Sequence, residues 1–269
     1  MSSINCTITR SGLLILLLAC SAFTVPPFMW YATYSIQNYY AHGCDPFHNL
    51  FTAHADAIGF SKAVNSAGLS SEVRHVYNRK DSECTASRWS GQYAEVNYVD
   101  FLFYAGHGCG TGPYLGCTPA YQVTNWSDIR FGGAGYLKWV QAASCKWFAV
   151  DTANTCITGM NEFQRWKNCF EGVHTIQGHR AITFEHFNSD SMSADFWNRW
   201  VYQNSTIHNA WRNAQVKWIY EKVGFPGLQP ATAAADLIYL NELWQDASNS
   251  PAPPGMKILT WATVGIPAY

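Results

Sequence analysis

The chain has 269 residues, enough for one large domain with a well-buried core. Charged residues make up 13% of the chain and aromatic residues 16%, which favours a compact, ordered protein and excludes a disordered one. The formal net charge of −1 gives no electrostatic reason to expect a nucleic-acid partner, and no block of Lys or Arg points to an anionic membrane surface.

The N-terminal residues have the layout of a secretory leader. Arg10 precedes the apolar run Gly12–Ala19, and small residues follow at positions 20–22. The run is too short to span a bilayer of ~30 Å alone, and Pro26-Pro27 interrupts any longer helix. We expect residues 1–24 to be a signal peptide or lipoprotein leader. Residues 25–269 would then form a single exported domain, secreted, periplasmic or held at the cell surface.

Two forms of membrane attachment remain open at this stage. The segment Leu17-Leu-Ala-Cys20 resembles a bacterial lipoprotein box, in which Cys20 would be lipidated. The leader can also stay uncleaved, because Phe28–Tyr34 continues with apolar residues. Either route would attach the domain to a membrane.

Apolar spacing predicts alternating strands and helices first, and mainly helices in the last hundred residues. A first strand over Met29–Tyr40 leads to a helix that begins at Asp45-Pro46, because Asp caps a helix and Pro suits its first position, and that ends at Gly68. The later elements are expected, in order, as a strand at Glu72–Tyr77, a loop at Asn78–Gly91, strands at Val99–Ala105 and Tyr136–Ala143, a helix at Asn161–Phe170, a strand at Val173–Ile176, helices at Met192–Gln203, Ile207–Val223 and Thr232–Trp244, and a closing strand at Lys257–Val264.

Cysteine usage supports export. Without Cys6 and Cys20 of the leader, seven of the nine cysteines remain, and in an oxidising compartment most would pair. An odd number leaves one thiol, and we expect it to be Cys145; the alternative is that Cys145 is itself bridged. The disulfide candidates are Cys109 with Cys117, Cys156 with Cys169, and Cys44 with Cys84.

Two of the predicted strands end at reactive residues. Val99–Ala105 leads to His107, and Tyr136–Ala143 leads to Cys145. Runs that are apolar on both faces are typical of buried, parallel central strands. Parallel neighbours would bring the imidazole and the thiol together at their carboxyl ends, where open α/β sheets place their sites.

This pair of residues predicts nucleophilic catalysis. A cysteine attacks as the thiolate, which a nearby histidine or the positive end of a following helix stabilises. His107 would act as base and later protonate the leaving amine. Gly108 has no side chain, so its N–H and the N–H of Cys145 can form an oxyanion hole.

The segments Phe101-Leu-Phe-Tyr-Ala-Gly-His107-Gly108 and Trp139-Val-Gln-Ala-Ala-Ser-Cys145 resemble the caspase, legumain and gingipain type of cysteine peptidase. The likeness extends to an uncharacterised secreted branch with the same Ala-Gly-His-Gly block. It implies an α/β fold, namely a caspase-like α/β/α sandwich with a mostly parallel sheet and a helical C-terminal half. It also implies a peptide or protein substrate, no cofactor, a His107–Cys145 dyad and Gly108 in the oxyanion hole. After Cys145, however, Lys146 is followed by Trp147 rather than Gly, so caspase specificity for Asp does not carry over.

Other polar residues have two readings each. Three acidic residues are candidates for a pocket that receives a basic substrate side chain, and the alternative is that each is an ordinary loop or helix-cap residue. They are Asp128, Asp151 and Asp190. A metal site at His174, His179 and His186 would follow no standard ligand spacing, and we expect no metal. A second hypothesis for the whole chain is a secreted, disulfide-stabilised binding protein that keeps the fold without catalysis.

Overall fold

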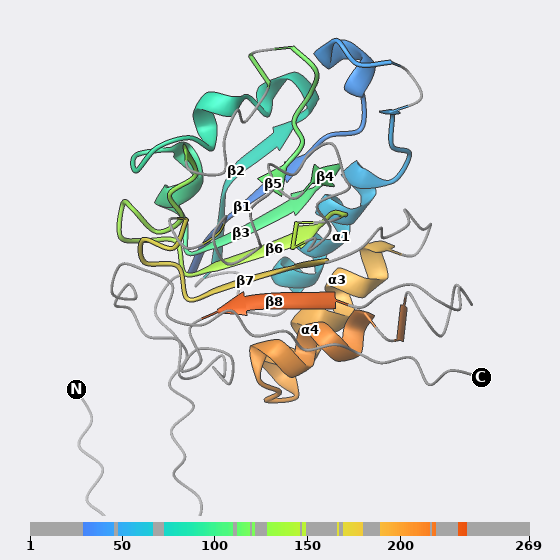
Figure 1. Cartoon of the computed structure of the whole chain (residues 1–269). Coiled ribbons are helices and arrows are strands. Elements are labelled where there is room, and N and C mark those ends of the chain that lie inside the picture. The colour runs from blue at the N-terminus through green and yellow to red at the C-terminus, as the bar shows by residue number, and fades with distance from the viewer. Residues whose placement is uncertain are drawn as a thin grey trace, which may run out of the picture.

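The structure is a computed structural model. It describes residues 29–45, 48–66, 73–109, 112–118, 120–121, 128–145, 147–148, 166, 169–179, 189–215, 217–218 and 231–235. Within these residues, one six-stranded sheet has the order β2-β1-β3-β6-β7-β8 (Figure 1). Its strands are β1 (Met29–Ser35), β2 (Val73–Lys80), β3 (Phe101–Ala105), β6 (Trp139–Ala143), β7 (Thr175–His179) and β8 (Ala231–Ala235).

The first five strands in this order run parallel, and β8 is antiparallel to β7. A short separate hairpin pairs β4 (Gly108–Cys109) with β5 (Gly112–Pro113). The protein therefore has an α/β fold with a mostly parallel sheet, as the sequence predicted.

Helices cover one face of the sheet. They are α1 (Ala53–Ser66), α3 (Ser189–Trp197), which continues as a π-helical turn over Asn198–Tyr202, and α4 (Ile207–Gln215) (Figure 1). Alternate residues of β3, namely Phe101, Phe103 and Ala105, pack on this side against α1, α3 and the turn. Burying a Phe side chain contributes roughly 2–3 kcal/mol, so this layer fixes which way β3 faces.

The other face of the sheet packs against loops and short 3₁₀ helices in the described part of the chain. The short helices are Tyr39–His42, Asp81–Glu83, Ala86–Arg88 and Glu95–Tyr98. Leu102 and Tyr104 of β3 point to this side, into a cluster with Trp89 and Trp147. The Trp89 ring meets those of Tyr104 and Trp147 edge-on, at centroid distances of 5.3 and 6.4 Å. Both sides of β3 are thus buried, as its uninterrupted apolar run requires.

Several predicted boundaries are corrected by the structure. β1 ends at Ser35 and a 3₁₀ helix follows, and β2 extends to Lys80 into the predicted loop. The first long helix begins at Ala53 rather than Asp45, because the chain before it is tied elsewhere: Leu50 N–H donates to the Gln37 carbonyl.

The helix predicted at Thr232–Trp244 is wrong at its start, where Ala231–Ala235 is a strand paired with β7. The helix expected at Asn161–Phe170, apart from Trp166 and the two residues at its end, and the closing strand at Lys257–Val264 lie outside the described residues. Among the residues that are described, no helix is long and apolar enough to cross a membrane.

Candidate active site at the ends of two central strands

The structure places His107 and Cys145 at corresponding positions beyond two adjacent strands. Ala105 of β3 and Ala143 of β6 are register partners, and each reactive residue lies two positions further along. Neighbouring strands are about 4.8 Å apart. Gly106 N–H also donates to the Ala143 carbonyl oxygen at 3.4 Å, so the two chains stay together past the strand ends. The predicted juxtaposition of these two residues is confirmed at the level of the backbone.

Gly108 makes the closest contact between the two segments. A Cβ atom built on Gly108 would lie 2.4 Å from the Cys145 carbonyl oxygen and 2.3 Å from Ser144 Oγ. Only glycine fits between these atoms. The residue after His107 therefore touches the backbone of Cys145 itself.

The His107 ring has a defined orientation. Its Nε2 lies 2.7 Å from the backbone carbonyl oxygen of His48. A carbonyl oxygen only accepts hydrogen bonds, so Nε2 carries the proton and Nδ1 of the neutral ring presents a lone pair. A histidine in this tautomer has the form that a general base needs.

Two tyrosine hydroxyls hold the backbone of His107. The Tyr39 hydroxyl oxygen accepts the His107 N–H at 2.6 Å, and the Tyr104 hydroxyl donates to the His107 carbonyl at 2.8 Å. Both hydroxyls also lie within hydrogen-bond distance of the Tyr114 carbonyl oxygen. The Tyr39 ring lies 4.7 Å from the His107 ring, centroid to centroid, and burial raises the pKa of the Tyr39 hydroxyl, which stays protonated.

The Gly108 N–H points away from the β4–β5 hairpin. Tyr114 N–H donates to the His107 carbonyl at 2.9 Å. Gly108 and Pro113 are therefore a non-hydrogen-bonded pair of the antiparallel ladder. In such a pair the N–H groups are directed outward from the partner strand. This direction suits an oxyanion donor.

Cys145 is half-buried and forms no disulfide. The helix expected to follow it, with its positive end at the thiol, lies outside the described residues.

The predicted disulfide pairing is wrong. Cys44 is bonded to Cys117, with Cα atoms 5.0 Å apart and a sequence separation of 73 residues. This excludes the pairs Cys44–Cys84 and Cys109–Cys117. Cys84 and Cys169 are buried thiols outside any disulfide, which excludes Cys156–Cys169 as well, and burial raises the pKa of both. The side chain of Cys109 and all of Cys156 lie outside the described residues.

The Cys44–Cys117 disulfide joins the two segments that hold the His107 backbone. Cys44 follows the 3₁₀ helix with Tyr39, whose hydroxyl accepts the His107 N–H. Cys117 follows the β4–β5 hairpin and Tyr114, whose N–H donates to the His107 carbonyl. Cys117 N–H donates to the His42 carbonyl at 3.1 Å, so the two loops are already paired where the disulfide joins them.

Residues 36–265 match the model of the family described as a domain of unknown function, DUF6345. The chain belongs to the DUF6345 family. No curated protein matches it.

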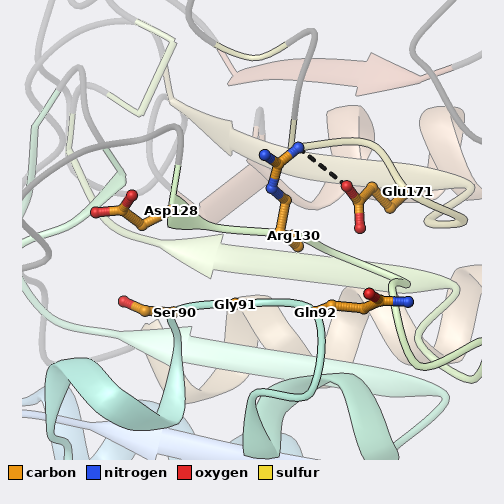
Figure 2. A pocket seen from close by; sticks show the side chains of 6 residues that line it. All are labelled: Ser90, Gly91, Gln92, Asp128, Arg130 and Glu171. Carbon is orange, nitrogen blue, oxygen red and sulfur yellow. Dashed lines mark hydrogen bonds and ion pairs between the residues drawn. The ribbon is translucent and has the colours of Figure 1, made fainter.

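In this DUF6345 chain, the first of the three acidic candidates, Asp128, is at a pocket. It lines an open pocket of about 550 Å³ with Arg130 and Glu171, whose ion pair is 2.9 Å long (Figure 2). The other lining residues are Ser90, Gly91 and Gln92. Asn97 fixes this pocket by donating to the Arg130 carbonyl at 2.7 Å, and Asn97 precedes the start of β3. The Arg130 end of the pocket therefore lies toward the amino-terminal end of β3, whereas Ile129, next to Asp128, would lie 3.2 Å from a Cβ atom built on Gly112 of β5. The acidic substrate pocket at Asp128 stays a prediction.

The structure tests neither of the other two acidic candidates. Asp190 is the second residue of α3, and its side chain is not among those described. Asp151 lies outside the described residues.

The histidines considered as metal ligands have other roles where they are described. His174 is fully buried before β7, where its ring meets Trp139 edge-on. His179 ends β7, where its Nδ1 donates to the Ser144 carbonyl oxygen at 3.0 Å and its Nε2 lies 2.8 Å from the side-chain amide of Gln215. Burial lowers its pKa, which keeps this ring neutral. No cluster of ligand-type side chains that could hold a metal ion occurs among the described residues, and His186 lies outside them.

Sequence reasoning missed the residues that orient His107. Tyr39 and His48 are 68 and 59 positions away in the chain, and nothing local marks them. A backbone carbonyl leaves no signal in the residue type at all. The sequence placed Tyr39 in the first strand and His48 in the helix after it, whereas the structure has both in the segment between β1 and α1.

Proposed function

We propose that the chain is a cysteine peptidase that uses His107 and Cys145 as its dyad. The observation that carries the proposal is the hydrogen bond from His107 Nε2 to the His48 carbonyl, because it leaves Nδ1 as the basic atom at the strand end beside Cys145. Gly108, packed on the Cys145 backbone with its N–H directed away from β5, supplies an oxyanion donor.

The reaction follows from these groups. The Cys145 thiol gives its proton to His107 Nδ1, and the thiolate sulfur forms a bond to the substrate's peptide carbonyl carbon. The N–H groups of Gly108 and Cys145 stabilise the oxyanion that develops. His107 returns the proton to the amine as the C–N bond breaks, which leaves an acyl-enzyme. Water, deprotonated by His107, then releases the acid and restores the thiol.

Export is part of the proposal. The Cys44–Cys117 disulfide supports it, since disulfides form and persist mainly in oxidising compartments. The leader-like run Gly12–Ala19 supports it independently. A cysteine nucleophile outside the cytosol must stay reduced, and the half-buried Cys145 is not in a disulfide.

The test uses variants of the two dyad residues with a matched control. Cys145→Ala and His107→Ala should abolish hydrolysis of a fluorogenic peptide library while the unfolding midpoint stays near that of the wild type. His48→Ala is the control: it removes the side chain but keeps the backbone carbonyl that accepts from His107, so most of the activity should remain. Undiminished hydrolysis by either dyad variant overturns the assignment.

Thiol reactivity gives a second test without a substrate. Iodoacetamide at neutral pH should alkylate Cys145 much faster than Cys84 and Cys169, whose thiols are buried with raised pKa values. The His107→Ala variant should slow the reaction of Cys145. Equal, slow labelling of all three thiols would favour a binding protein that has the fold without the chemistry.

A further inference from the structure

Three exposed aromatic rings lie at the amino-terminal ends of three adjacent strands. Trp30 is the second residue of β1, Tyr98 precedes β3, and Tyr136 precedes β6, with 43%, 38% and 51% of their surfaces exposed. The order of the strands is β1-β3-β6, so the three residues follow one another along one edge. We call these three residues the aromatic edge.

Backbone hydrogen bonds hold the aromatic edge together. Asp100 N–H donates to the Trp30 carbonyl at 2.8 Å, and Trp30 N–H donates to the Asp100 carboxylate at 2.9 Å. Lys138 N–H donates to the Asp100 carbonyl at 3.0 Å, and the rings of Tyr98 and Tyr136 lie 6.2 Å apart, centroid to centroid. The three rings are therefore fixed on a rigid part of the sheet rather than on separate loops.

The charged residues between these rings neutralise one another. Lys138 Nζ is 2.9 Å from Asp100 Oδ1, and the two side chains are 8% and 18% exposed. The surface that the aromatic edge presents is thus amphipathic, with indole and phenol groups around a closed ion pair. Tyr and Trp rings have an apolar body and a polar group, and they are enriched at the boundary between an apolar and an aqueous phase.

The chain itself indicates which boundary this is. The apolar run Gly12–Ala19 ends ten residues before Met29, and the chain enters the domain through Met29 at the same edge of the sheet. Ten residues reach at most about 36 Å. A domain held by that run in a bilayer has the aromatic edge as the part nearest to the lipid.

We propose that the aromatic edge lies against the lipid–water interface of a membrane in which the run Gly12–Ala19 is retained. The candidate site is at the other end of β3 and β6, about 16 Å further from the lipid along five residues of strand. His107 and Cys145 then face the aqueous side, where a peptide can reach them. The proposal does not depend on peptidase activity.

Nitration of tyrosines by a water-soluble reagent tests the proposal on the full chain in phosphatidylcholine–phosphatidylglycerol vesicles. Peptide mapping should show Tyr98 and Tyr136 nitrated several-fold more slowly than Tyr40, which is 64% exposed and follows the opposite end of β1. The reference is the Leu14→Arg/Leu17→Arg chain, whose interrupted run cannot enter the bilayer. In that chain all three tyrosines should react at similar rates.

Three results would overturn the proposal. One is nitration of Tyr98 and Tyr136 in vesicles at the rate of Tyr40. Another is protection that persists in the Leu14→Arg/Leu17→Arg chain and grows with protein concentration, which identifies a second copy of the chain as the occupant. The third is a mature chain on vesicles whose mass shows that Gly12–Ala19 has been removed.

Discussion

The hydroxyl oxygen of Tyr39 lies 2.6 Å from the backbone nitrogen of His107 and accepts its hydrogen bond. The same hydroxyl donates to the Tyr114 carbonyl at 2.9 Å, so one buried group connects the candidate base to the segment that follows it. Tyr39 belongs to a 3₁₀ helix after β1, and His107 follows β3. The position of the base thus depends on a side chain 68 residues away.

Tyr39→Phe should therefore lower both stability and activity. The substitution leaves the His107 N–H without its acceptor in a buried place, which costs about 1–3 kcal/mol. We expect kcat to fall while KM stays near the wild-type value, because the base is displaced and the substrate surface is not. Urea unfolding and steady-state kinetics measure the two effects. Tyr40→Phe is the control, because that ring is exposed and its loss should leave kcat and the urea midpoint unchanged. An unchanged kcat in Tyr39→Phe contradicts the role given to Tyr39.

Strong reductants should abolish the proposed peptidase activity, although most thiol enzymes tolerate or need them. The Cys44–Cys117 bond joins the two segments that hold the His107 backbone. The disulfide closes a loop with a sequence separation of 73 residues and so lowers the entropy of the unfolded chain. Its reduction should lower the free energy of unfolding by about 4 kcal/mol. Activity and the thermal midpoint should fall together as dithiothreitol is raised.

The Cys44→Ala/Cys117→Ala variant separates this effect from reduction of Cys145. It should have the lowered midpoint without any reductant, and dithiothreitol should change it no further. A wild-type activity that rises steadily with dithiothreitol would show that the disulfide does not support the site.

Gly108→Ala should disrupt the site more than a comparable substitution nearby. The added methyl group would lie 2.4 Å from the Cys145 carbonyl oxygen, a backbone atom that cannot move without displacing the end of β6. We expect loss of activity and a destabilisation of roughly 1–3 kcal/mol from overpacking. Gly178→Ala in β7 is the matched control, because its methyl group would meet only the Phe148 ring, at 3.2 Å, and the Trp147 Cβ, at 3.4 Å. Circular dichroism and peptide hydrolysis on both variants distinguish the two outcomes; equal behaviour contradicts the close packing.

The strands that carry the candidate site could be predicted because each leads to its reactive residue from an uninterrupted apolar run. Phe101–Ala105 is completely buried, and a strand with two buried faces has few other places in an α/β fold. The register of Ala105 with Ala143 then follows from parallel pairing, and with it the placement of His107 beside Cys145.

The features that the sequence did not predict depend on distant partners. Ala231–Ala235 is rich in a strong helix former, yet it pairs with the exposed edge of β7, and this tertiary contact overrides the local preference. The disulfide partner of Cys44 is decided by the loops that meet at His107, not by the nearest cysteine in the chain. The His48 carbonyl is invisible in any residue pattern.

Acid should remove the stability that Asp81 provides. Asp81 Oδ1 accepts the N–H groups of Gln37 and Asn38, both at 2.8 Å, and Oδ2 lies 2.9 Å from His54 Nε2. Burial raises the pKa of this carboxyl, but these hydrogen bonds outweigh it, and the net pKa is lowered. A lowered pKa in the folded state means that the stabilising contribution is present above the unfolded value of about 3.9 and is lost as the pH falls through the folded value.

Asp81→Asn isolates that contribution. Asparagine tolerates the backbone φ of +42° at this position and still offers a carbonyl oxygen, so the change removes the charge with little else. The variant should be less stable than the wild type at pH 7, and the difference between their urea midpoints should shrink toward zero as the pH falls below the unfolded pKa of about 3.9 and through the lower folded pKa. Glu95, whose pKa is also lowered in the folded chain, is present in both proteins, so its titration cancels in the comparison. A midpoint difference that stays constant from neutral pH into acid would show that the Asp81 charge does not hold the loop that carries Tyr39 and His48.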